Sequence, residues 1–203
     1  MFERSIRVKS TSHQLLANYL TDIYLNRYSS SCKKAFAIGC VQPDKNPTTY
    51  LKGSIRSQWL RGHNWENARR YIRRIGKRLE RKHRFHVSDF YQLGKLIHYT
   101  ADAFTYAHND LFSETLADHR GYESRLHKYL IGYLDSMNGP VEDNIPYDLS
   151  TYEFITRSHS RYMRSDPGIH TDAQYCVHAC RHVLFMLLLG KEVFEMEDPG
   201  VLL

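Results

Sequence analysis

"YQLGKLIHYTADAFTYAHND", residues 91–110, places two histidines and an aspartate in a stretch that otherwise has the pattern of a buried helix. Its apolar residues recur at three- and four-residue spacing, which is typical of a helix in a protein core. A buried polar side chain without a partner costs about 1–3 kcal/mol. His98, Asp102 and His108 therefore either face water or share a partner inside the protein, and a metal ion is one such partner.

The rest of the chain also favours helices, because alternation of β-branched and polar residues never lasts more than a few positions. Residues 39–54 contain Pro43, Pro47, Gly39 and Gly53, and these turn-forming residues predict a long connection between helices. We predict an all-α fold, a single-domain multi-helix bundle over residues 1–203 with a metal site between helices. The expected helices cover about 10–28, beginning at Ser/Thr caps, then 65–84, 88–110, 111–137, 151–163 and 172–190.

Length and composition place the chain in the ordinary soluble globular class. It has 203 residues, of which 42% are hydrophobic and 25% charged, and no apolar run approaches the roughly 20 residues that span a bilayer. The N-terminal residues lack the apolar segment of a signal peptide, so we expect a cytoplasmic protein. The net charge of +6 favours phosphate-bearing partners.

The four cysteines have no zinc-finger or redox spacing. We expect buried free thiols, with a Cys/His metal site around Cys176 and Cys180 as the alternative.

Two histidine–carboxylate pairs have a spacing that suits metal binding. Residues four apart on a helix lie about 40° apart around its axis, so His98 and Asp102 share a face, as do His119 and Glu123. On a continuous helix His108 would lie some 15 Å beyond His98 and point elsewhere, near the turn to the next helix. Two such pairs on adjacent helices predict two metal centres, and imidazole with carboxylate suits zinc.

Further residues extend these pairs into an ordered pattern. It runs through "TSHQLL" (His13), "QPDKNP" (Asp44), "RGHNWE" (His63), "LGKLIHYTADAFTYAH" (His98, Asp102, His108) and "DHRGYE" (His119, Glu123). The pattern resembles that of the zinc-dependent phospholipase C family, which includes secreted bacterial lecithinases and alpha-toxins and, more distantly, the fungal single-strand nucleases. The motif-bearing part covers about residues 10–130.

The resemblance implies two to three zinc ions and a role for each residue of the pattern. Asp44, His63, His98 and Asp102 would hold one zinc, and Asp102 would bridge to a second zinc that His13 also binds. The third zinc would be held by His108, His119 and Glu123. The implied reaction is phosphodiester hydrolysis by zinc-activated water. Asp44 would steer or deprotonate that water, or serve only as a ligand.

Two departures from the family pattern concern the second zinc and the substrate. The secreted enzymes start with a Trp whose amino group binds zinc, whereas this sequence starts with Met1, whose amine would have to replace it. An aromatic residue of the choline pocket is replaced by Lys45, and another by Leu60. Because a lysine repels a quaternary ammonium group, we expect an enzyme that is not choline-specific, with Lys45 near the substrate.

The basic segment 67–86 carries nine Lys and Arg residues. It is either a solvated helix face or a surface for peripheral contact with an anionic membrane, and nucleic acid is the less favoured partner. The predicted substrate is a phospholipid or another phosphodiester. A nuclease-like phosphodiesterase and a catalytically inactive metal-binding scaffold are the alternatives.

Overall fold

The protein is all-α, as the sequence predicts. The computed structural model describes residues 2–45, 65–109, 116–137, 148–166 and 168–189, and this part of the chain contains helices and no strand. The helices in chain order are α1 (Phe2–Tyr24), α2 (Ser30–Lys45), α4 (Trp65–Glu80), α5 (Val87–Ala103), the 3₁₀ turn η1 (Tyr106–His108), α6 (Leu116–Ser136), α7 (Thr151–Tyr162), α8 (Ile169–Leu184) and the π-helical η2 (Phe185–Leu189). That residues 1–203 form one domain stays a prediction.

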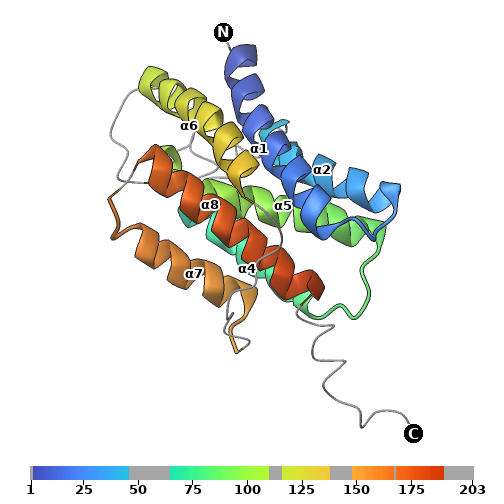
Figure 1. Cartoon of the computed structure of the whole chain (residues 1–203). Helices are drawn as coiled ribbons and strands as arrows, with labels where there is room; N and C mark the ends of the chain where they lie inside the picture. The colour runs from blue at the N-terminus through green and yellow to red at the C-terminus, as the bar shows by residue number, and fades with distance from the viewer. Residues whose placement is uncertain (1, 46–64, 110–115, 138–147, 167, 190–203) are drawn as a thin grey trace, which may run out of the picture.

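Helix α5, which carries most of the opening stretch, is central to the packing. It contacts α1, α2, α4 and α8, while α6 packs on α1 and α8, and α7 packs on α4 and α8. Figure 1 shows α8 crossing the middle of the molecule, with α6 and α1 above it and α7 below. Leu93, Leu96 and Ile97 of α5 are fully buried or nearly so. Contacts on several sides explain why nearly all residues from Leu93 to Ala103 of this helix are buried, polar ones included.

Two glycines allow α2 and α5 to approach closely. A Cβ atom on Gly94 of α5 would collide with the carbonyl oxygen of Phe36, and one on Gly39 of α2 would collide with the carbonyl oxygen of Tyr91. Each glycine thus lies against the backbone of the other helix, where any side chain would force the helices apart. This contact brings the C-terminal end of α2, with Asp44, next to α5.

Several predicted boundaries are wrong. The turn-rich connection was predicted from residue 39, yet α2 continues to Lys45 with Pro43 inside its last turn. A proline near a helix end removes one backbone hydrogen bond without ending the helix at that residue. Helix α1 begins at Phe2, so the Ser/Thr residues at 10–12 lie inside it and do not cap it. The long basic helix ends at Glu80, and α5 begins at Val87 with His86 as its N-cap, whereas the helix was predicted to begin at residue 88.

Candidate metal centre

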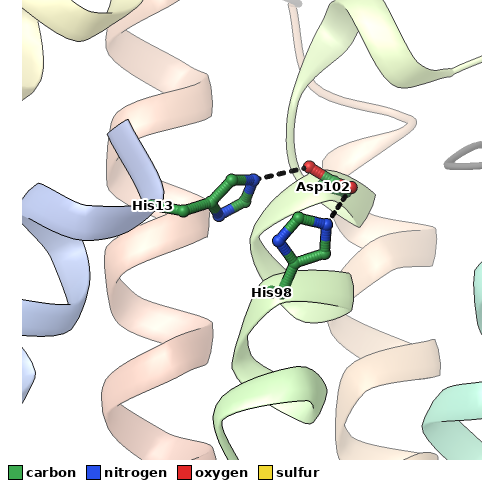
Figure 2. A group of neighbouring side chains, drawn as sticks. All are labelled: His13, His98 and Asp102. Atoms are coloured by element: carbon green, nitrogen blue, oxygen red, sulfur yellow. Dashed lines mark ion pairs between the residues drawn. The ribbon is translucent and has the colours of Figure 1, made fainter. Parts of the chain in front are cut away.

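Three helices bring the first group of predicted ligands together. His13 lies on α1, Asp44 at the end of α2, and His98 and Asp102 one turn apart on α5. The two oxygens of Asp102 face different histidines: Oδ1 lies 3.2 Å from His13 Nε2, and Oδ2 lies 3.2 Å from His98 Nε2. Figure 2 shows both imidazole rings turned toward this carboxylate. The arrangement suits a carboxylate shared between two ions.

Asp44 completes this group, which we call the first cluster (His13, Asp44, His98 and Asp102). Its Oδ1 lies 3.8 Å from His98 Nε2 and its Oδ2 lies 3.9 Å from His13 Nε2. The side chain is 2% exposed, and no residue in the described part of the chain donates a hydrogen bond to Oδ2. A buried carboxylate oxygen without a hydrogen bond costs free energy unless a cation compensates it.

A backbone contact orients His98 toward the first cluster. His98 Nδ1 lies 2.8 Å from the carbonyl oxygen of Cys40 on α2, so Nδ1 carries the proton and Nε2 is left to face the carboxylates. Burial by itself would lower the pKa of His98, but the carboxylates of Asp102 and Asp44 and the two hydrogen bonds outweigh it and raise that pKa in the metal-free site. Sequence reasoning missed Cys40, because a backbone acceptor on another helix leaves no trace in side-chain identity.

The second cluster consists of His108, His119 and Glu123. Glu123 Oε1 lies 3.0 Å from His119 Nε2, one turn earlier on α6, and 3.3 Å from His108 Nε2. The pairing of His119 with Glu123 agrees with their predicted common face. Here the ligands lie within a short segment of sequence, whereas those of the first cluster are spread from residue 13 to residue 102.

The expected direction of His108 is wrong. Helix α5 ends at Ala103, and the chain turns back through η1, so that His108 Nε2 lies 3.9 Å from Asp102 Oδ1. Asn109 holds this turn: its side-chain amide donates to the carbonyl oxygens of Ala103 at 3.1 Å and Thr105 at 2.9 Å. The two clusters are therefore neighbours, with Asp102 between them.

The remaining predicted site residues lie elsewhere or outside the described part. Met1 and His63 lie outside the described residues. Lys45 is exposed at the last position of α2, directly after Asp44. All four cysteines are free, and Cys40, Cys176 and Cys180 are buried, in agreement with the expectation of free thiols.

The donor set fits zinc. Two ligands at about 2.0–2.2 Å from a tetrahedral zinc ion lie roughly 3.3–3.6 Å apart, close to the separations within both clusters. The ligand atoms of His13, His98 and Asp102 all lie within 4.8 Å of one another, as do those of His108, His119 and Glu123. The ligand atoms that the described residues offer in both clusters are imidazole nitrogens and carboxylate oxygens, and zinc accepts both.

The fold and this donor set define an all-α protein with metal-binding groups between its helices. The chain belongs to the zinc dependent phospholipase C family, whose model matches residues 12–168. Comparisons with curated proteins and with solved structures found no match. Family membership supports zinc as the metal and a general phospholipase C-like function. Within the described residues, no helix combines the length and the apolar character that crossing a membrane requires.

Proposed function

We propose that the chain is a zinc-dependent phosphodiester hydrolase of the phospholipase C type that binds two to three zinc ions. The observation that carries the proposal is the convergence of two imidazoles and two buried carboxylates in the first cluster, beside the three ligands of the second. Bound zinc supplies a Lewis acid that polarises a phosphoryl oxygen and lowers the pKa of water.

Each side chain of the first cluster has a different role, which follows from its position. Asp102 presents one oxygen to each of His13 and His98 and so fixes both rings relative to each other. His98 is further held by the Cys40 carbonyl, which reserves its Nε2 for the site. Within the described residues, Asp44 Oδ2 accepts no hydrogen bond, so it can orient the attacking water and take its proton.

The position and charge of Lys45 support the proposal that the substrate carries no choline group. Its exposed ammonium group follows directly after Asp44 at the end of α2. A positive charge beside the site attracts the phosphate of a substrate and repels a quaternary ammonium headgroup. We propose a phospholipid with an uncharged or anionic headgroup, or a smaller phosphodiester, as the substrate.

The test combines metal analysis with a panel of substrates. Protein purified without chelator should contain two to three zinc equivalents, and it should hydrolyse phosphatidylglycerol vesicles or bis-p-nitrophenyl phosphate faster than phosphatidylcholine vesicles. Faster cleavage of single-stranded DNA than of any lipid would favour the nuclease alternative. Zinc binding without turnover of any substrate would favour the scaffold, and less than one zinc equivalent after reconstitution would overturn the metal site.

We also propose that the protein contacts anionic membranes through α4. The side chains of Ala68, Ile72, Ile75 and Leu79 are buried in the core, and the opposite face is basic. That face, the basic face, consists of the exposed residues Arg69, Arg70, Arg73, Arg74, Lys77 and Arg78. Each basic residue near an anionic leaflet contributes about 1 kcal/mol to binding.

A further inference from the structure

Asp172, near the start of α8, has a fully buried carboxylate that takes no part in either cluster. Its Oδ2 accepts a hydrogen bond from the backbone N–H of Tyr106 at 2.7 Å and another from the hydroxyl of Tyr122 at 2.8 Å. Its Oδ1 accepts one from the hydroxyl of Tyr162 at 2.7 Å. A buried carboxylate with hydrogen-bond donors at both oxygens is satisfied as an acceptor.

The two donors to Oδ2 belong to the elements that carry the second cluster. Tyr106 lies in η1, two residues before His108, and Tyr122 lies in α6, directly before Glu123. One oxygen atom thus ties together the turn and the helix whose ligands must meet. The donor to Oδ1, Tyr162, comes from α7, which carries no ligand of either cluster.

The separation of these ligands depends on how η1 sits against α6. His108 Nε2 and Glu123 Oε1 lie 3.3 Å apart, and a metal ion tolerates errors of only about 0.2 Å in its ligand distances. A short 3₁₀ turn has few hydrogen bonds of its own to hold that spacing. A shared acceptor on a third element, α8, supplies the constraint.

We propose that Asp172 is a positioning residue for the second cluster, which holds η1 and α6 at the spacing that metal binding requires. The inference rests on the proposed function, because it takes the second cluster to bind zinc. Asp172 lies beyond residues 12–168, the part that the family model matches.

The two tyrosines that donate hydrogen bonds to Asp172 provide a matched pair of variants. Tyr122→Phe and Tyr162→Phe each remove one hydroxyl from a buried ring and one hydrogen bond to Asp172. Zinc affinity is measured by competition with a chromophoric chelator. The zinc-binding step that is lost in the Glu123→Gln variant is assigned to the second cluster. We expect Tyr122→Phe to weaken that step about tenfold and Tyr162→Phe to change it less than twofold. Both variants should lower the thermal midpoint of the zinc-free protein.

A double-mutant cycle then separates Asp172 from a direct effect of Tyr122 on its neighbour Glu123. Asp172→Asn should weaken the same zinc step, and adding Tyr122→Phe to it should have little further effect. Additive losses, or equal effects of the two tyrosine variants, would overturn the inference while leaving the proposed metal site intact. A wild-type protein with no zinc step sensitive to Glu123→Gln would overturn the proposed function of this cluster and the inference with it. If Asp172→Asn does not fold, the tyrosine pair alone still decides.

Discussion

Asp102 lies between the two clusters. Its Oδ1 lies near His13 and, at 3.9 Å, near His108, while its Oδ2 faces His98. A single carboxylate among three imidazoles from α1, α5 and η1 supplies negative charge to every ion bound between them. Its charge therefore matters more to the site than that of any peripheral ligand.

We expect Asp102→Asn to lower zinc content by at least one equivalent and to reduce phosphodiester hydrolysis by a hundredfold or so. The change keeps the shape of the side chain and removes its charge, so loss of metal follows from electrostatics. Asp135→Asn, the same change at an exposed position on α6, should leave zinc content and activity as they are. An Asp102→Asn protein with full metal content and turnover would contradict the shared-carboxylate assignment.

His159 has a role in stability that depends on pH. Its ring is 5% exposed, stacks on Trp65 with ring centroids 3.9 Å apart, and bonds Asn109 Oδ1 through Nε2 at 2.9 Å. Burial lowers its pKa from 6.5 to about 4. Between these two values the unfolded chain binds the proton and the folded protein does not, so stability falls as the pH drops from about 6.5 toward 4.

His159→Gln should remove this dependence. In chelator-treated protein, urea unfolding at several pH values between 4.5 and 6.5 should show a slope that is shallower than that of the wild type by up to about 1.4 kcal/mol per pH unit. His83→Gln removes an exposed imidazole from the turn before α5 and should leave the slope unchanged. Identical slopes in all three proteins would show that His159 titrates normally in the folded state.

At the scale of the elements, the contact between α2 and α5 sets the first cluster. The two glycines let the backbones touch, and the same contact places the Cys40 carbonyl against His98 and Asp44 beside it. A small separation of the helices would move one carboxylate away from the other ligands. Packing and metal geometry are thus coupled through this pair of helices.

We expect Gly94→Ala to destabilise the protein by about 1–3 kcal/mol, since the added methyl group meets the backbone of α2. Gly132→Ala is the matched control: its Cβ meets no atom within 4 Å, and helix propensity should make it neutral or stabilising by up to about 1 kcal/mol. Denaturant unfolding measures both. Equal effects of the two substitutions would show that the close approach of α2 and α5 is unimportant.

Sequence reasoning located most of the helices and most of the candidate ligands, but it missed the helix α2 (Ser30–Lys45) and the geometry between elements. The i,i+4 pairs of α5 and α6 follow from helix periodicity alone, which is why His98 with Asp102 and His119 with Glu123 were predictable. The turn at His108 depends on side-chain hydrogen bonds of Asn109 to nearby carbonyl oxygens and on a tertiary hydrogen bond to Asp172, and helix periodicity indicates neither. The only sequence feature that marks Asp172 is its position as an acidic residue in the first turn of a helix. Acidic residues are common there because they interact favourably with the helix dipole, so this position does not indicate a role near the clusters.

At the scale of the whole molecule, positive charge is concentrated on one helix. The chain has a net charge of +6, and the basic face of α4 presents six exposed Arg and Lys side chains along one helix. Such a surface attracts an anionic leaflet over about a Debye length, roughly 10 Å at 0.1 M salt.

Binding to phosphatidylserine-containing vesicles should weaken when this face loses charge. Replacing Arg70 and Lys77 with glutamine should reduce affinity by about 2 kcal/mol, or roughly thirtyfold, and the difference should shrink in high salt. In the control, Lys128 and Arg164 are replaced by glutamine, so it has the same net charge as the first variant but loses exposed charges outside α4. It should bind nearly as the wild type does. Equal losses in both proteins would show that net charge, and not the basic face, governs binding.

The distribution of ligands along the chain has a consequence for protein synthesis. The first cluster joins residue 13 of α1 to residue 102 of α5. Because α1 leaves the ribosome first, this cluster can form only after α5 has been synthesised. The ligands of the second cluster emerge close together, yet the carboxylate that we propose sets their spacing follows on α8, near the end of the described chain. A nascent chain released before α8 should therefore lack the final arrangement of the second cluster, and full zinc uptake should mark the completion of folding.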